Sequence, residues 1–236
     1  MFSRTAELYD LIYQQFKDYA GECRRIADLL ARLHPQATRL LDVACGTGEH
    51  ARVLAAQHGY QVDGLDIEPE FIRIARSKNP GGEFFCADMI HFELQRRYDI
   101  ILCLFSSIGY ARTLENVGRA LATFRRHLSP GGLVVLEPWF APEQWRTGTV
   151  HLTTAEGAGL KVCRMSSSTV RERVSVLDFQ YLIGSAEGIE HRQEVHELGL
   201  FTTEEMRRCF AEAGLDVLEH DAEGLTGRGL YAARAA

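Results

Sequence analysis

The stretch from Arg39 to Gly48 constrains the fold of this chain more than any other segment. It reads RLLDVACGTG, an apolar run that contains Asp42 and ends in small residues and a turn bracketed by Gly46 and Gly48. Apolar side chains on both faces are typical of a buried parallel strand, and glycine lets a ligand approach the backbone closely. A helix is expected to begin near Glu49, with its unpaired N–H groups and positive dipole end pointing at whatever the loop binds. A carboxylate or a phosphate on the ligand suits such a site.

Strand patterns and helical patterns alternate on either side of this loop. Further strands are expected over residues 60–66, 83–87, 98–104 and 133–137, with a turn over residues 129–132. Helices are expected over residues 6–13, 17–33, 49–58 and 113–128, and another from residue 69 onward. This alternation predicts an α/β fold built on a doubly wound, Rossmann-like parallel sheet. Such sheets bind their ligands at the carboxyl ends of the strands.

Between residues 148 and 200 the apolar period changes from 3.6 to 2, which predicts antiparallel strands inserted before the last helix. One apolar face carries Leu177, Phe179, Tyr181 and Ile183. A later polar face, which either contacts an acceptor or is simply solvated, carries Arg192, Glu194 and His196. Thr202-x-x-Glu205 is a capping box for the last helix, and two closing strands follow. The chain therefore divides into residues 1–148, 149–200 and 201–236.

Composition argues against several classes of partner. A net charge of -6 and a pI of 5.9 disfavour a nucleic-acid partner, which normally demands a basic stripe. The six cysteines are scattered without a C-x-x-C, and the nine histidines form no ligand-spaced cluster with them, so no metal and a reducing compartment are expected. No run approaches membrane-spanning length and no apolar signal core opens the chain, so the sequence predicts a cytoplasmic protein without membrane contact.

The glycine loop by itself leaves two cofactors open. Gly46-x-Gly48-x-x-Ala51, with Asp66 closing the next strand, satisfies the dinucleotide fingerprint, in which the distal acid bonds a ribose hydroxyl. Two features favour a different cofactor: Asp42 precedes the first glycine by four residues, and Ala87-Asp88-Met89 supplies a second acid after the third strand. With these features the run closely resembles motif I of the class I S-adenosylmethionine-dependent methyltransferases.

That resemblance implies a seven-stranded methyltransferase sheet and S-adenosylmethionine as cofactor. Asp66 would bind the cofactor's ribose, while Asp88 and Met89 would flank its adenine. The other cofactor positions that the resemblance implies are Asp42, Ala44, Gly46, Gly48, Ile67 and Leu104. Leading helices fold over the cofactor in many members, so Tyr9 and Tyr19 are either lid residues or ordinary packing residues.

Three later segments extend the resemblance to one subgroup of these methyltransferases. Residues 105–110, 137–140 and 224–230, in this order after the glycine loop, look like the N,N-dimethyltransferases of nucleotide-linked amino sugars of the desosamine and mycaminose type. The match spans almost the whole chain, although Phe140 stands where a second tryptophan often occurs and the position of Tyr110 can be histidine. It implies a small-molecule acceptor, a nucleotide-linked amino sugar, bound by Glu137, Trp139 and Arg228. A guanidinium offers a fork that matches phosphate oxygens, and a tryptophan there either stacks on the acceptor or packs.

The expected reaction is displacement at a sulfonium methyl by an acceptor lone pair. An amine only has to be unprotonated, so one side chain that accepts a proton or orients the amine is enough. Tyr110 is the first candidate by motif position and His196 the second. Two other functions stay open: a small-molecule methyltransferase with a hydroxyl or carboxylate acceptor, in which Arg228 has no role toward substrate, and a non-catalytic cofactor-binding protein.

Overall fold

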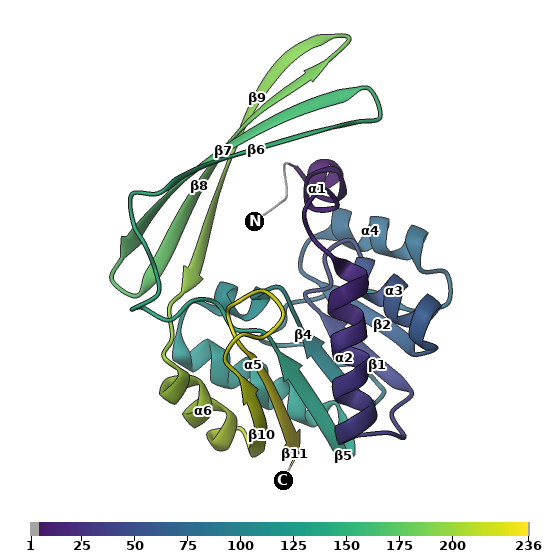
Figure 1. Ribbon diagram of the computed structural model, residues 1–236. Helices are drawn as coiled ribbons and strands as arrows, with labels where there is room; N and C mark the ends of the chain where they lie inside the picture. The colour runs from purple at the N-terminus through teal and green to yellow at the C-terminus, as the bar shows by residue number, and fades with distance from the viewer. Residues whose placement is uncertain (1–4, 236) are drawn as a thin grey trace.

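The computed structural model describes residues 5–235. Its main layer is a seven-stranded sheet in the order β10-β11-β5-β4-β1-β2-β3 (Figure 1). The strands are β1 (Arg39–Val43), β2 (Gln61–Asp66), β3 (Phe84–Cys86), β4 (Tyr98–Cys103), β5 (Leu128–Leu136), β10 (Leu215–Asp221) and β11 (Leu230–Ala235). The first five strands are parallel, and β11 runs antiparallel to both of its neighbours. The predicted doubly wound α/β sheet is confirmed.

Helices cover both faces of this sheet. The helices within residues 5–235 are α1 (Ala6–Tyr13), α2 (Tyr19–Leu33), α3 (Glu49–His58), α4 (Pro69–Lys78), the short 3-10 helix η1 (Ser107–Ala111), α5 (Leu114–Arg126) and α6 (Thr203–Glu212). The apolar stripes of α2, α3 and α4 pack on one face, and those of α5 and α6 pack on the other. Because both faces are covered, the central strands are apolar almost throughout. No helix within residues 5–235 is long and apolar enough to cross a membrane.

The predicted inserted sheet is also confirmed. Four antiparallel strands follow in the order β6 (Val150–Gly157), β7 (Leu160–Arg171), β8 (Val174–Ser185) and β9 (Gly188–Gly199). Figure 1 shows this sheet standing beyond the carboxyl ends of the parallel strands, with α1 beside it. Its apolar face packs on α1, where Leu8 and Ile12 meet Phe179, Tyr181 and Ile183. The insertion thus forms a wall above the end of the sheet where ligands are expected to bind.

Local signals placed most element ends well. The capping box of α6 has both of its reciprocal bonds, between Thr202 and Glu205. The turn expected over residues 129–132 is wrong, because β5 already begins at Leu128 and carries that segment as an irregularity. The register against β4 jumps there from Leu128 to Leu133, with Gly131 at a φ of 75°. A proline without an N–H and a left-handed glycine explain the excursion.

Candidate active site

Two adjoining cavities lie at the carboxyl ends of the parallel strands. The larger is also bounded by α1 and the inserted sheet, and the smaller by α1, α2 and α3. The larger has a volume of about 360 Å³, and the smaller has a volume of about 30 Å³. The predicted site residues on the larger are Tyr9, Ala44, Gly46, Asp66, Ile67, Asp88, Met89, Tyr110, Trp139, His196 and Arg228. Those on the smaller are Tyr9, Tyr19, Asp42, Ala44, Gly46 and Leu104. The structure therefore brings together residues that span almost the whole chain.

The carboxylate of Asp66, at the end of β2, accepts a hydrogen bond from the loop after β1. The Gly46 N–H donates to Asp66 Oδ2 at 2.9 Å, and the Glu68 N–H donates to Asp66 Oδ1 at 2.9 Å. Burial raises the pKa of Asp66, and these backbone donors oppose that shift. Gly46 has a φ of 55° and open space where a side chain would begin, so the loop can receive a ligand against its backbone.

Gly48, predicted as a cofactor residue, packs closely against α4. It lies on neither cavity, at the N-terminal cap of α3 with a φ of 75°. A Cβ there would lie 2.7 Å from Asn79 Nδ2 and 3.0 Å from the Ala75 Cβ. Gly48 therefore allows close packing of the loop against α4.

Asp42 faces the smaller cavity as a buried acid. Its side chain is on β1, the residue is 2% exposed, and Oδ2 has no hydrogen-bond partner among residues 5–235. Burial raises the pKa of Asp42 to about 6, with a smaller contribution in the same direction from Asp66. An ionised carboxylate in such a place is costly unless a cation pairs with it. The smaller cavity therefore suits a cationic group.

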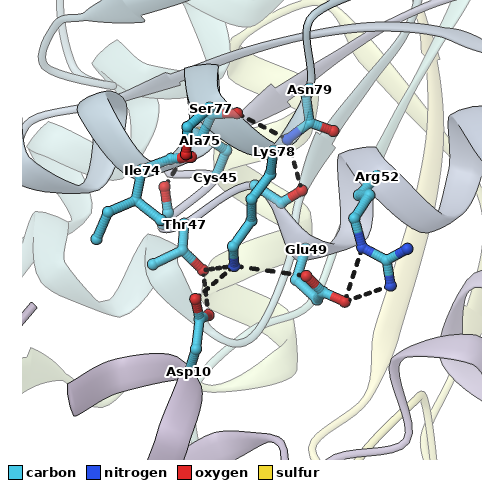
Figure 2. Close-up of polar contacts among 12 residues, drawn as sticks. Asp10, Cys45, Thr47, Glu49, Arg52, Ile74, Ala75, Ser77, Lys78 and Asn79 are labelled. Atoms are coloured by element: carbon cyan, nitrogen blue, oxygen red, sulfur yellow. Dashed lines mark hydrogen bonds and ion pairs between the residues drawn. The ribbon is translucent and has the colours of Figure 1, made fainter. Parts of the chain in front are cut away.

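Helix α1 is tied to the loop after β1 by a polar cluster (Figure 2). Thr47 Oγ1 donates to Asp10 Oδ1 at 2.6 Å, and Lys78 Nζ of α4 donates to the other oxygen of Asp10. Lys78 also contacts Thr47 Oγ1 at 3.2 Å and Glu49 Oε2 at 3.5 Å. These bonds fix α1 against the cavity mouth, so that Tyr9 forms part of both cavity walls.

The turn after β4 is strained. Phe105 and Ser106 have φ values of 51° and 61°, which non-glycine residues rarely adopt. The turn is held by Ser106 Oγ, which donates to the Pro138 carbonyl at 2.6 Å, and by the Phe105 N–H, which donates to Glu137 Oε2 at 2.7 Å. Each such residue costs about 1–3 kcal/mol and is typical of functional sites. Phe105 consequently borders both cavities.

Glu137 was predicted to bind substrate, and the structure does not bring it to either cavity wall. It is fully buried, and it accepts hydrogen bonds from Thr226 Oγ1 and, at 3.4 Å, from Arg228 Nη2 in addition to the Phe105 N–H. Because β5 ends just before it, its carboxylate points at the two neighbouring loops. Glu137 thus holds Arg228 in place, and Arg228 is the residue of this pair that lines the cavity.

Arg228 and Trp139 form the far wall of the larger cavity. The guanidinium carbon of Arg228 lies 5.3 Å from the Trp139 ring centroid and 5.4 Å from that of Phe105. Trp139 Nε1 donates to Ser175 Oγ of β8 at 2.8 Å, which joins this wall to the inserted sheet. Arg228 Nε has no hydrogen-bond partner among residues 5–235. The wall therefore offers a buried donor and a cation to an anionic group.

Tyr110 and His196 meet across the gap between the main sheet and the insertion. The Tyr110 hydroxyl lies 2.8 Å from His196 Nδ1, which joins η1 to β9. Burial raises the pKa of Tyr110. Burial also lowers the pKa of His196, which Glu194 opposes. A neutral imidazole that is hydrogen-bonded to a phenol can accept the phenol's proton while the phenol oxygen takes up a proton from another group.

Sequence reasoning missed a buried ion cluster behind Phe105. Lys17 Nζ lies 2.6 Å from both oxygens of Glu22 and 4.0 Å from the Phe105 ring centroid, and His50 Nε2 lies 2.8 Å from Glu22 Oε2. Burial lowers the pKa of Lys17, and Glu22 opposes that effect. A lysine just before a helix is normally a surface residue, so no local signal in the sequence marked Lys17 as buried.

Known proteins place this geometry in a family. A methyltransferase-domain family model matches residues 40–132. The dTDP-3-amino-3,6-dideoxy-α-D-glucopyranose N,N-dimethyltransferase of Streptomyces fradiae is 42% identical over 228 residues, which cover 96% of this chain and 89% of that protein. The chain belongs to the family of the S-adenosylmethionine-dependent dTDP-amino sugar N,N-dimethyltransferases. It is therefore a methyltransferase, with S-adenosylmethionine as cofactor.

Two solved structures support the family assignment. The crystal structure of DesVI from Streptomyces venezuelae has a TM-score of 0.91 and 37% identity, and the match covers 98% of each chain. S-adenosylmethionine-bound CalS10, an amino pentose methyltransferase from Micromonospora echinaspora, has a TM-score of 0.86 and 35% identity, with 97% of each chain covered. Membership in this methyltransferase family removes the nicotinamide and the non-catalytic interpretations of the glycine loop.

Proposed function

We propose that this methyltransferase transfers methyl groups to the amino nitrogen of a sugar that is linked to a nucleoside diphosphate. The observation that carries the proposal is Arg228, a guanidinium held by a buried carboxylate at the cavity wall, whose Nε lacks a partner within residues 5–235. Phosphate oxygens supply the acceptors that a buried guanidinium requires. The names of three relatives, each a dTDP-amino sugar N,N-dimethyltransferase, support the same acceptor class.

In this proposal the cofactor occupies both cavities. Asp66 would hold the ribose, and Ile67, Asp88 and Met89 would surround the adenine in the larger cavity. The cationic amino end suits the smaller cavity, where Asp42 Oδ2 has no hydrogen-bond partner within the part of the chain that the structure describes, and where Tyr19, Ala44 and Leu104 form neighbouring walls. When bound, S-adenosylmethionine supplies a methyl group on a positively charged sulfur.

The remaining work of the enzyme is alignment, exclusion of water and removal of a proton. The turn at Phe105 and helix α1 with Tyr9 enclose the reacting groups, and correct alignment can be worth about 7 to 11 kcal/mol of barrier. Tyr110 would face the acceptor nitrogen with His196 behind it, to orient the amine and accept its proton. In this proposal residues 1–148 carry the lid and the cofactor site. Residues 149–200 carry the acceptor side, and residues 201–236 close the core and contribute Arg228. The scattered cysteines favour a reducing compartment, so the cytoplasm remains our prediction for location.

Replacement of Arg228 tests the acceptor class. A charged hydrogen bond is worth about 1.5–3 kcal/mol, so Arg228→Gln should raise the KM for a dTDP-linked amino sugar by roughly 10- to 150-fold, with a smaller effect on kcat. Calorimetry should show that thymidine diphosphate binds to the wild type in the presence of S-adenosylhomocysteine and binds weakly to the variant. Arg171→Gln is the control, because the Arg171 side chain is 75% exposed on β7.

Two outcomes would contradict the proposal. An unchanged KM for the nucleotide-linked acceptor would remove Arg228 from substrate binding. Failure of thymidine diphosphate to bind beside S-adenosylhomocysteine would leave a methyltransferase with a different small-molecule acceptor, for example a hydroxyl or a carboxylate.

A further inference from the structure

A line of buried polar side chains continues behind Tyr110 and His196. Glu194 Oε2, on the same strand and face as His196, lies 3.7 Å from His196 Nε2. Thr5 Oγ1, at the N-terminal cap of α1, donates to Glu194 Oε2 at 2.6 Å. The three residues Thr5, Glu194 and His196 are 1%, 5% and 1% exposed. Three separate segments of the chain therefore meet in one buried line that ends at the cavity.

The position of Glu194 determines which nitrogen of His196 carries the proton. A carboxylate beside Nε2 favours the tautomer with hydrogen on Nε2, and this leaves the lone pair of Nδ1 free to accept from the Tyr110 hydroxyl. The same carboxylate stabilises the imidazolium that forms when His196 takes up a second proton. Thr5 fixes the carboxylate itself, and this contact exists only while α1 lies against the inserted sheet.

An amine acceptor makes this arrangement useful. At neutral pH an amino group in water is mostly ammonium, which has no lone pair with which to attack. We propose that Glu194 is a positioning residue for proton removal, which holds His196 so that Tyr110 and His196 together take the proton from the acceptor's ammonium group. This inference rests on the proposed function, because only an amine acceptor arrives as a cation that must lose a proton before it has a lone pair with which to attack.

The proton transfer balances. The ammonium nitrogen gives one proton to the Tyr110 oxygen while the Tyr110 hydroxyl proton moves to His196 Nδ1. The nitrogen keeps the electron pair of its broken N–H bond and can attack, and the phenol is restored. The imidazolium, paired with Glu194, afterwards releases its proton to solvent water.

Other titratable groups around the line act on the protonation of His196. Within residues 5–235, the titratable groups that act on His196 or Tyr110 include Glu194 of β9, Arg164 of β7, Tyr181 of β8, Asp66 of β2, and Tyr9 and Tyr13 of α1. Burial lowers the pKa of His196, and the positive charge of Arg164 lowers it further. His196 is therefore neutral near pH 7, and Glu194, which raises its pKa, favours the uptake of a proton.

The test compares pH profiles of kcat between pH 6 and pH 9, with saturating S-adenosylmethionine and amino sugar. Glu194→Gln keeps the shape of the side chain but removes the negative charge beside Nε2 that stabilises the His196 imidazolium. The wild type should stay active below the pKa of the acceptor amine, whereas the variant should lose about tenfold in rate per pH unit below that pKa. Near pH 9 the two rates should converge. Glu187→Gln, in the exposed turn before β9, is the matched control.

A second variant keeps the test decisive if Glu194→Gln folds poorly. Tyr110→Phe should give the same altered pH profile, and the double variant should be no slower than Tyr110→Phe alone, because the residues act as one unit. A Glu194→Gln profile parallel to that of the wild type, or an unaltered Tyr110→Phe profile, would overturn the inference. If the wild type itself methylates no amino sugar, the proposed function fails, which is a separate result.

Discussion

Asp42→Asn should make the free enzyme more stable and bind its cofactor more weakly. Burial raises the pKa of Asp42 from 3.8 to about 6. A shift of about 2 units corresponds to about 3 kcal/mol, because each unit of pKa is worth about 1.4 kcal/mol. At pH 8 the ionised Asp42 therefore costs the folded protein about 3 kcal/mol, and a neutral asparagine of the same shape removes that cost.

The sign of the pH dependence follows from the raised pKa. The folded protein binds the Asp42 proton more tightly than the unfolded chain does, so the stabilising contribution is present below pH 4 and is lost as the pH rises from about 4 to about 6. At pH 5 the wild type should regain about 1.4 kcal/mol from this group. The stability gain of Asp42→Asn should therefore be about 1.4 kcal/mol smaller at pH 5 than at pH 8.

The affinity for the cofactor should fall in Asp42→Asn, whereas the stability of the free enzyme rises. Asp42 is the buried anion of the smaller cavity, and a charged hydrogen bond to an ammonium group is worth about 1.5–3 kcal/mol. Asp42→Asn should therefore weaken S-adenosylhomocysteine binding by roughly 10- to 150-fold. This combination of gained stability and lost affinity is typical of a functional residue held in an unfavourable environment.

Urea unfolding without ligand at pH 5 and pH 8, together with calorimetric titration of S-adenosylhomocysteine, measures both effects. Asp216→Asn is the control, because Asp216 is an exposed aspartate on the edge strand β10. A variant less stable than the wild type at pH 8, or a stability difference that does not change with pH, would refute the account of Asp42. Unchanged ligand affinity would remove Asp42 from the cofactor site.

Two further replacements test how the loop after β1 is supported. Gly48→Ala should destabilise the protein by about 1–3 kcal/mol in urea unfolding, because Gly48 has a φ of 75° and a Cβ would lie 2.7 Å from Asn79 Nδ2; unchanged stability would contradict the packing role of Gly48. Lys78→Met removes the ion pair to Asp10 and should weaken S-adenosylhomocysteine binding about fivefold by loosening α1, an effect of about 1 kcal/mol. Arg73→Met, on the exposed side of the same helix, is its control, and equal affinities of the two variants would argue against α1 as a lid.

Much of the fold could be predicted because its signals are local. The apolar run through Leu40 and Val43 and the glycines after it predicted a strand, a turn and a helix, and the change of period near residue 150 predicted the inserted sheet. Capping at Thr202 fixed the start of α6. Each of these features depends on neighbours within a few residues, so it can be predicted from the sequence alone.

The candidate site could be predicted only in part. Asp66, Asp88 and Arg228 stand in recognisable motifs, and the structure places all three on the larger cavity. Glu137 stands in a motif as well, yet its carboxylate turns inward to hold Arg228, because a motif does not say which way a side chain points at the end of a strand. Lys17 has no motif, and its burial depends on a segment of the chain far from it.

The sequence by itself determined the alternation of elements, the position of the glycine loop and the type of cofactor. Only the tertiary structure decided which side chains act together: Tyr110 and His196 are 86 residues apart, and Thr5 and Glu194 are 189 residues apart. The physical reason is that periodicity and capping depend on short-range backbone geometry, whereas the partner of a buried polar group is set by the packing of whole elements against each other. Thr5 can donate to Glu194 only because helix α1 packs against the inserted sheet over the end of the parallel strands.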